Sequence, residues 1–422
     1  MSQEVVSQIF MVLTLALMLT GKAPIYLTAF VGATISALIY GVVLIPREGE
    51  IALSTLIQSG LHSVIIDMLG VLLFIGIMER SGFLQIIIVN LMKFGKKIGQ
   101  GPGVCTAGGI AAGIIGGLTG FTQPAITAVI TGPAAIKLGV DPNKVAGTQA
   151  LAGTLGNFGG FTHPTMVAVV ATAGISFGMI NVIGAIVALS IFAVSYILLQ
   201  KSTKNVDTQE VDIEDIINRS IEGVQEVPLF KAIFPFIFLL VGFVLGIPIV
   251  VVGIAAGIIT TLLASKSFIE GEKAMMEGLT KIITPLFATV SFLFMSAVIN
   301  HIGLIGIISN VMEPFLVFAP IQIMILVAAV TAFLTQSNAA SIAIIIPFLT
   351  IVIDSGANPF AAAVAAAGAP AIMQYYLTGG PVAALSTVIP VIPNTDLKTA
   401  NLFQRPCLLA GLFVLIVITL FL

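Results

Sequence analysis

The chain has very few charged residues: Asp, Glu, Lys and Arg make up only 9% of its 422 residues, whereas 58% are hydrophobic. Soluble domains carry about 25% charged residues. A water-soluble enzyme is therefore excluded, because it could not cover its surface with polar groups. The formal net charge of -2 offers no basic surface for nucleic acid. The composition predicts a polytopic membrane protein.

Cysteines and catalytic motifs are also scarce. The two cysteines, Cys105 and Cys407, form neither a disulfide scaffold nor a zinc motif. The sequence contains no Gly-x-Ser-x-Gly, no Walker A loop and no HExxH. We therefore expect no enzyme, no cofactor and no bound metal. With no ATPase domain in the sequence, energy for transport would come from an ion gradient or from the substrate gradient.

Apolar segments long enough to span a bilayer, about 17–25 residues each, recur along the chain. They lie at 5–20, 24–45, 62–79, 178–200, 229–247, 249–265, 282–300 and 406–422. The stretches 102–138 and 320–357 have a polar kink and predict re-entrant hairpins, while 144–175 and 360–390 are interrupted by glycine, proline and polar residues. The runs 83–97 and 304–318 predict helices along the interface. The predicted fold is all-α, with about ten transmembrane helices, two re-entrant hairpins and helices broken at the midplane.

Features of the first half recur in order in the second. Asp141-Pro142 lies 217 residues before Asn358-Pro359, and the same offset matches Asn157 to Gln374. Between Lys201 and Glu226 lie 10 of the 36 charged residues. We therefore predict two repeats, 1–200 and 228–422, joined by a cytoplasmic acidic linker at 201–227.

Basic residues predict the orientation. If the N-terminus lies outside and each half has an odd number of spans, 16 of the 17 basic residues are cytoplasmic and only Arg47 lies outside. An odd number of spans also inverts the second repeat relative to the first. In this arrangement Arg405 ends the last loop, where positive-inside anchoring explains it without substrate contact. The predicted location is a membrane crossed several times, in bacteria the inner membrane.

Inverted repeats with interrupted helices are typical of secondary transporters, which bind substrate near the midplane where helices break. Four segments meet this description, and we name them tip 1 (116–124), tip 2 (335–341), break 1 (156–164) and break 2 (374–381). Their polar side chains and the N–H groups of broken helices suit an anion. The predicted substrate-binding residues are Thr122, Gln123, Asn157, Thr162, His163, Gln336, Ser337, Asn338 and Thr378.

The coupling ion, Na+ or H+, would bind near the same segments. Candidates are His163, Asn157 and Asn338 at the breaks and tips. Asp67 is a further candidate, because an acid inside a span is costly and usually functional. The alternative function is a Na+/H+ antiporter of a related fold. Antiporters need carboxylates at the midplane, and the two tips and two breaks contain no Asp or Glu.

The segment 119–168 resembles the core of the L-lactate permease family through its GFTQP tip, its LGVDP turn and a polar break that ends in FTHP. The run SNAASIAIIIPF (337–348) is similar to the Ser/Asn-rich hairpin tip of that family. More broadly, the chain resembles the ion transporter superfamily, which includes gluconate permeases and citrate or dicarboxylate symporters. This resemblance implies transport of a small organic anion by a transport domain that moves against a scaffold, in a homodimer.

Overall fold

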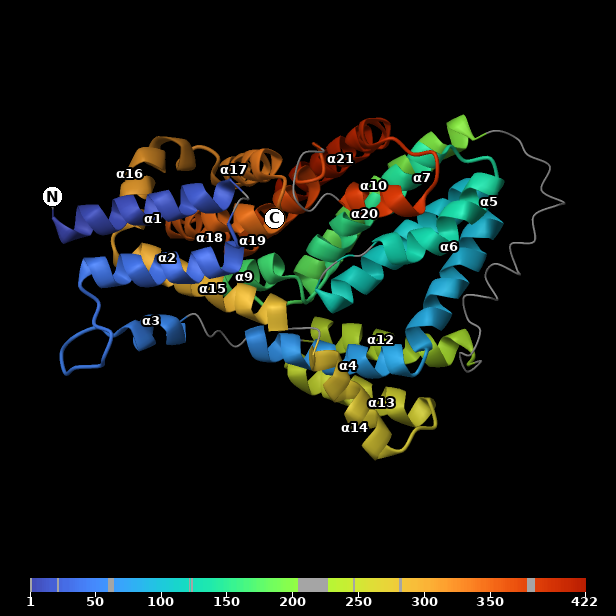
Figure 1. The fold of residues 1–422 in the computed structure, drawn as a ribbon, viewed down its shortest axis with the longest axis horizontal. Helices are drawn as coiled ribbons and strands as arrows, with labels where there is room; N and C mark the ends of the chain where they lie inside the picture. Colours follow the sequence, from blue (N-terminus) through green and yellow to red (C-terminus); the bar gives the residue numbers. More distant parts are fainter. Residues whose placement is uncertain are drawn as a thin grey trace.

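The computed structural model describes residues 2–20, 23–59, 64–120, 122, 124–203, 227–245, 247–280, 283–377 and 384–422. This part of the chain is built of helices (Figure 1). Helices satisfy their backbone hydrogen bonds within one segment, which is why they are suited to lipid. The predicted all-α class is confirmed for the described residues.

The first half starts with two apolar helices and continues into the first hairpin. Its early elements are α1 (Gln3–Leu19), α2 (Ile25–Tyr40), α3 (Leu53–Ser59) and α4 (Val64–Arg80). α5 (Phe83–Thr119) is kinked where Gly99 and Gln100 leave helical geometry. It therefore combines the predicted interfacial run 83–97 with the first arm of the hairpin, whose second arm is α6 (Pro124–Lys137). Then follow α7 (Pro142–Ala150), α8 (Ala152–Thr154), a π-helix (Leu155–Gly159), α9 (Pro164–Ala173) and α10 (Met179–Ser202).

The second half has a similar order of elements. It contains α12 (Leu229–Val244), α13 (Ile249–Leu263), α14 (Phe268–Leu279), α15 (Ile283–His301) and α16 (Leu304–Leu316). The second hairpin is formed by α17 (Pro320–Thr335) and α18 (Asn338–Asp354). After it come α19 (Pro359–Met373), α20 (Ala384–Val388), a 3-10 turn (Ile389–Val391) and α21 (Leu397–Thr419). The last span predicted at 406–422 therefore begins earlier, because Asp396 caps α21 through the Thr399 N–H.

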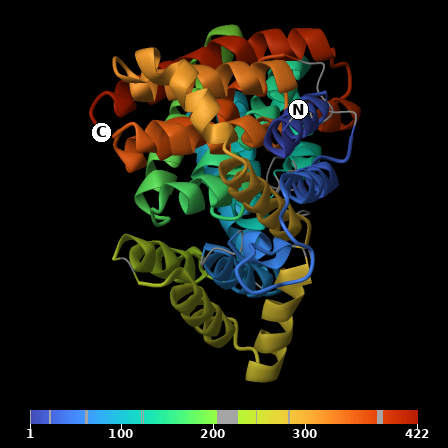
Figure 2. The ribbon, with the colours of Figure 1, turned by 90° about the vertical axis from the view of Figure 1, so that its left-hand side faces the viewer.

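The two halves pack against each other reciprocally. α4 lies against α13 and α14, while α15 lies against α2 and α3. The returning arm of the first hairpin, α6, contacts α20, and that of the second hairpin, α18, contacts α9. Figures 1 and 2 show α4, α12, α13 and α14 as a group at the lower edge of the view, and Figure 1 shows α3 at nearly the height of α4. An exchange of this kind is expected from a pseudo-two-fold relation, although the inverted orientation of repeats 1–200 and 228–422 stays a prediction.

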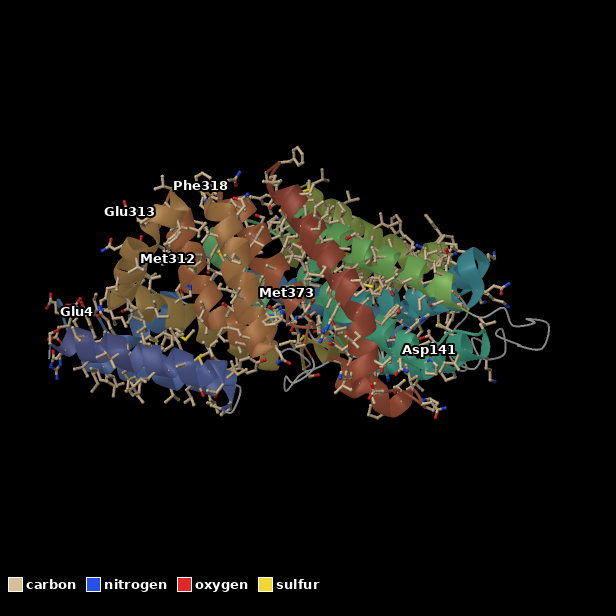
Figure 3. The ribbon with its side chains drawn as sticks, turned by 90° about the horizontal axis from the view of Figure 1, so that it is seen from above. Glu4, Asp141, Met312, Glu313, Phe318 and Met373 are labelled. Carbon is tan, nitrogen blue, oxygen red and sulfur yellow. The ribbon has the colours of Figure 1, made fainter. Side chains whose placement is uncertain are left out.

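Charged residues lie at both ends of the long axis, and α14 carries others. Figure 3 labels Glu4 and Glu313 at one end and Asp141 toward the other, with Met373, the last residue of α19, between them. Large apolar side chains are exposed along α1, α12, α17 and α21, among others. An apolar surface of this extent is typical of contact with lipid or a partner.

The number of spans is not confirmed. Among the described residues, α5, α10 and α21 are long and apolar enough to cross a membrane, and the pair α15 and α16, bent by 80°, would be a fourth span. Seven further apolar helices have 10–17 residues. By length and composition alone, the structure therefore supports several apolar helices rather than the predicted count of ten.

Candidate functional site

Tip 1 is rich in glycine and packs closely against break 1. The chain leaves α5 through Gly120, whose φ of 84° favours glycine. A Cβ atom on Gly116 or Gly156 would collide with the hydroxyl of Thr122. The Thr122 Oγ1 atom is buried and has no hydrogen-bond partner. Gln123, the other predicted donor of tip 1, lies outside the described residues.

Break 1 is hydrogen-bonded to tip 1. The π-helix ends at Gly159, and Gly160 is extended, with φ -82° and ψ 166°. The Phe161 N–H donates to the Gly117 carbonyl oxygen at 3.0 Å. Thr162 Oγ1 donates to the same oxygen at 3.2 Å. These two bonds satisfy a carbonyl that the last turn of α5 leaves without a helical partner.

The start of α9 adds a buried polar group that sequence analysis missed. His163 is the N-cap residue, and its Nδ1 atom accepts a hydrogen bond from the Thr165 N–H at 3.3 Å. The Thr165 side chain is 1% exposed, and its hydroxyl has no hydrogen-bond partner. Thr165 lies one residue beyond the polar break in the sequence. Its position in the first turn after Pro164 was the signal that could have identified it.

α10 supports break 1 through Asn181. The Asn181 Nδ2 atom donates to the Gly160 carbonyl at 2.6 Å, and its Oδ1 atom accepts from the Gly178 N–H at 2.9 Å. The side chain thereby satisfies a carbonyl that the broken helix releases. Sequence analysis missed Asn181 because a lone polar residue near the start of an apolar span has no distinctive pattern.

Tip 2 carries polar side chains where tip 1 has glycine. Gln336 has a φ of 50°, and the Ser337 Oγ atom caps α18 by accepting from the Ala340 N–H at 3.2 Å. Asn338 is only 3% exposed, and neither its Oδ1 nor its Nδ2 atom has a hydrogen-bond partner. The Gln336 Oε1 atom is also buried without a partner. Two amide side chains at the start of α18 therefore keep hydrogen-bonding capacity for another molecule.

Break 2 connects tip 2 with break 1. The Gln374 Oε1 atom accepts a hydrogen bond from the Asn338 backbone N–H at 3.0 Å. The Tyr375 hydroxyl accepts one from Asn157 Nδ2 at 3.1 Å. Asn401 of α21 donates to the Tyr375 carbonyl at 3.0 Å. Thr378, the predicted donor of break 2, lies outside the described residues.

Together these hydrogen bonds link the two tips and the two breaks. Tip 1 joins break 1 through Gly117, the breaks join through Asn157 and Tyr375, and break 2 joins tip 2 through Gln374. The predicted residues that the structure places on these connected segments are Thr122, Asn157, Thr162, His163, Gln336, Ser337 and Asn338. Their role in binding substrate or ions stays a prediction. Asp67 lies in α4, and its side chain is outside the described part of the structure.

Buried polar atoms without partners concentrate in the same region. In the described part of the chain there are eight such atoms, and five of them belong to Thr122, Thr165, Gln336 and Asn338. Buried polar atoms in native proteins are nearly always hydrogen-bonded. Leaving one unpaired costs about 1–3 kcal/mol. These donors and acceptors are therefore the groups best placed to bind a small polar molecule or ion.

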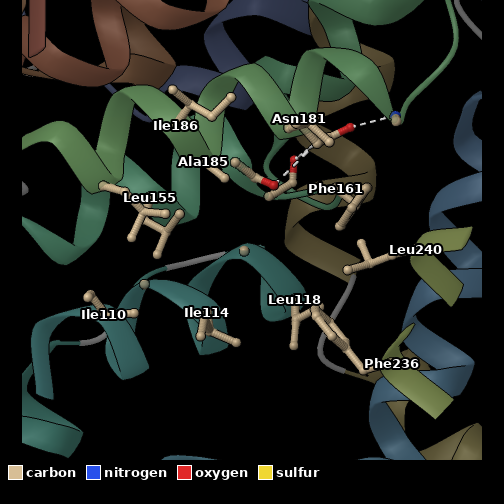
Figure 4. A pocket seen from close by; sticks show the side chains of 17 residues that line it. Ile110, Ile114, Leu118, Leu155, Phe161, Asn181, Ala185, Ile186, Phe236 and Leu240 are labelled. Atoms are coloured by element: carbon tan, nitrogen blue, oxygen red, sulfur yellow. Dashed lines mark hydrogen bonds between the residues drawn. The ribbon is translucent and has the colours of Figure 1, made fainter. Parts of the chain in front are cut away.

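A separate apolar cavity of about 420 Å³ lies beside break 1 (Figure 4). Its walls come from α5, the π-helix, α10 and α12, and include Ile114, Leu155 and Phe236. Asn181 is the polar side chain in this wall, and it is already bonded to backbone groups. None of the predicted substrate donors that the structure describes lines this cavity. The cavity is unsuited to a carboxylate, because a charged group is costly to bury among apolar side chains.

Comparisons with known proteins match solved structures over nearly the whole chain. The chain is similar to MtrF of Neisseria gonorrhoeae, from a class of antimetabolite efflux pumps, with a TM-score of 0.62, 12% identity, and coverage of 99% of this chain and 94% of that one. It is also similar to the YdaH transporter of Alcanivorax borkumensis, described as having an unusual topology, with a TM-score of 0.61, 15% identity, and coverage of 99% and 98%. No protein-family profile and no curated protein sequence matches. The chain has the fold of a polytopic membrane transporter.

These matches correct the family suggested by the sequence. Both neighbours are transporters rather than enzymes, which supports the general class. They are not L-lactate or gluconate permeases. Short Gly- and Pro-containing turns such as GFTQP recur wherever a hairpin must turn or a helix must break, so they identify a local structure better than a family.

Proposed function

We propose that the chain is a secondary active transporter of a small organic anion of the mono- or dicarboxylate class, coupled to Na+ or H+. The observation that carries this proposal is the group of buried polar atoms without partners on tip 1, tip 2 and the first turn of α9. The fold shared with membrane transporters supports the general class. We further propose a homodimer in a bacterial inner membrane.

The carboxylate would bind at the starts of helices. Both α9 and α18 begin at the connected segments, and a helix N-terminus carries roughly half a positive charge. Among the described residues of these segments, Asn338 Nδ2 and the hydroxyls of Thr122 and Thr165 are the buried donors without partners. Neutral donors and helix ends hold an anion less firmly than a fixed ion pair does. Moderate binding suits a carrier, which must release its substrate.

The coupling ion would use the acceptors that a carboxylate cannot use. Asn338 Oδ1 and Gln336 Oε1 are oxygen atoms without hydrogen-bond partners, and such oxygens suit a hard cation. His163 offers a different route, because a proton on Nδ1 would remove the acceptor that caps α9. The proposal therefore leaves Na+ and H+ as the two ions to be tested separately.

The transport cycle would move the tips and breaks relative to the remaining helices. We assign the hairpins, the breaks, α10 and α21 to a transport domain and the other spans to a scaffold. The reciprocal packing of α6 on α20 and of α18 on α9 supports one unit built from both halves. Alternating access would then expose the same site to each side of the membrane in turn.

A Na+/H+ antiporter is the alternative. Exchange of cations would need an acidic side chain at the site, and the tips and breaks contain no Asp or Glu. Among the described residues there is also no group of three or more His, Cys, Asp or Glu side chains. Asp67 would be the acid to test if the chain moved protons against Na+ without an anion.

Asn338→Ala is the substitution that tests the proposal most directly. The purified protein is placed in proteoliposomes, and uptake of radiolabelled carboxylates is measured under a Na+ gradient and under a pH gradient. Uptake by N338A should fall at least about tenfold, the effect expected from losing a hydrogen bond to a charged group. Its melting temperature should stay the same or rise, because the variant loses a buried amide without partners and keeps the backbone bond to Gln374.

Asn90→Ala is the matched control. The Asn90 Nδ2 atom donates to the Ile86 carbonyl within α5, away from both tips. N90A should transport at the normal rate. Normal transport by N338A would show that the anion binds elsewhere. The antiporter would be favoured over the anion transporter if vesicles with the wild-type protein took up no carboxylate but moved protons in response to a Na+ gradient.

A further inference from the structure

Arg405 lies inside a membrane-spanning helix rather than in the loop expected from the sequence. α21 begins at Leu397, so Arg405 stands eight residues further along, about 12 Å along the helix axis. α21 is one of the described helices that are long and apolar enough to cross a membrane. The side chain of Arg405 is half-buried. A permanent cation at such a place is costly and is most often functional.

The side chain of Arg405 lies next to break 2. Its Nε atom donates to Asn401 Oδ1 at 3.1 Å, and its guanidinium carbon is 5.2 Å from the centroid of the Tyr376 ring. The same Asn401 side chain donates to the carbonyl of Tyr375. The Tyr376 ring packs in turn against Phe333, near the end of α17, with centroids 5.8 Å apart. Arg405 is therefore held against break 2 by the Tyr376 ring and, through Asn401, by the Tyr375 carbonyl.

Most of the hydrogen-bonding capacity of Arg405 is unused. A guanidinium group has five N–H donors, and Nε uses one of them on Asn401. Among the described residues, Nη1 and Nη2 have no hydrogen-bond partner, and no Asp or Glu forms an ion pair with Arg405 within 4.0 Å. Two parallel N–H groups of a guanidinium match the two oxygens of a carboxylate.

We propose that Arg405 binds a carboxylate of the substrate at break 2 and thereby selects the anion over its neutral amide. This inference rests on the function proposed above and adds a cation to a site that otherwise has neutral donors. Tyr376 holds the plane of the guanidinium, and Asn401 fixes its Nε side. The Nη side is the one that receives the carboxylate. The alternative without a role in binding is that the Arg405 side chain extends to the lipid headgroups, as arginines near helix ends often do.

The test compares Arg405→Gln and Arg405→Lys in proteoliposomes, with a labelled carboxylate that the wild-type protein transports and its primary amide as competitor. R405Q should raise KM about 30-fold or more, as expected when a carboxylate loses its bidentate partner. It should also lose the discrimination between the acid and the amide. R405K keeps the charge without the fork, so it should show an intermediate KM and reduced discrimination.

Lys398→Gln is the matched control, because it removes a cation from the first turn of the same helix. Lys398 is exposed, and K398Q should leave KM and discrimination unchanged. If R405Q has the same KM and the same discrimination as the wild-type protein, this inference is overturned and a lipid contact is favoured. If R405Q does not fold, the same result in R405K overturns it. That result would leave the proposed function intact, since wild-type uptake and N338A test it independently. A wild-type protein that takes up no carboxylate would overturn both.

Discussion

Tip 1 and tip 2 occupy matching places in the two halves but are held in different ways. Tip 1 is fixed through its backbone, since the Gly117 carbonyl accepts from the Phe161 N–H and from the Thr162 hydroxyl of break 1. Tip 2 is joined to break 2 by a side chain, Gln374, whose Oε1 atom accepts from the Asn338 N–H. A backbone contact needs glycine and leaves few side chains for a ligand. A side-chain contact leaves the neighbouring amides available, and both amide atoms of Asn338 are without partners.

The difference suggests a division of roles between the two tips. Tip 1 and break 1 form a close contact of fixed geometry, in which the Thr122 hydroxyl is the one described side-chain atom that is buried without a hydrogen-bond partner. Tip 2 offers three such atoms, on Gln336 and Asn338. We expect substitutions at the tip 1 contact to affect folding and transport together. Substitutions at tip 2 should affect transport alone.

Gly160→Ala should produce the largest effect. The backbone of Gly160 has angles that alanine accepts, so only space matters. A Cβ atom would collide with the Gly156 carbonyl and with Gly117, and backbone atoms can move only by separating break 1 from tip 1. We expect uptake to be abolished and the protein to lose about 1–3 kcal/mol of stability. Thermal unfolding in detergent and uptake in proteoliposomes measure these two effects.

Gly306→Ala is the control for this substitution. Gly306 lies in α16, and a Cβ atom there would meet nothing within 4 Å. G306A should be neutral or slightly stabilising, since alanine favours a helix over glycine. A G160A protein with a normal melting temperature and normal uptake would contradict the view that tip 1 depends on backbone contact.

Tyr375→Phe should have an intermediate effect, because it breaks the bond between the breaks without opening a cavity. The variant removes the hydroxyl that accepts from Asn157 Nδ2 and leaves a buried amide short of a partner. Losing this hydrogen bond costs about 1 kcal/mol, which corresponds to an increase in KM of about fivefold. A matched change is Tyr196→Phe, whose hydroxyl bonds to the Ile98 carbonyl outside the site. Equal KM values in Y375F and Y196F would show that the bond between the breaks does not shape the site.

Asp396 should produce the smallest effect, since it lies at the start of α21 and far from both tips in the sequence. The Thr399 hydroxyl and N–H both donate to the Asp396 carboxylate and lower its pKa. A carboxyl group whose pKa is lowered by folding stabilises the protein above its unfolded pKa, about 3.9. This contribution is lost as the pH falls through the lowered value.

The measurement is the melting temperature of wild-type protein and Asp396→Asn as a function of pH. We expect a small advantage for the wild-type protein near neutral pH, because solvent screens an exposed carboxylate. The advantage should disappear on acidification below about pH 4. Uptake at neutral pH should be equal. A difference in melting temperature that grows toward low pH would contradict this assignment.

Much of the fold followed from local patterns in the sequence. Apolar runs placed most helices, and the two Pro-containing turns that match between the halves begin α7 and α19. Asp141 accepts from the N–H groups of Asn143 and Lys144, and Asn358 accepts from those of Phe360 and Ala361. Caps of this kind act within three residues, so they can be recognised without knowing the rest of the structure.

The contacts that shape the candidate site were decided by tertiary structure. Asn157 and Tyr375 are 218 residues apart in the sequence, and no local pattern relates them. Arg405 was expected in a loop, yet the start of α21 at Leu397 places it beside break 2. Hydropathy, turn residues and caps depend on neighbours along the chain, so they can be recognised from the sequence alone. Which buried polar atoms meet, and which stay without partners, depends on how segments more than 200 residues apart pack against each other in the folded protein.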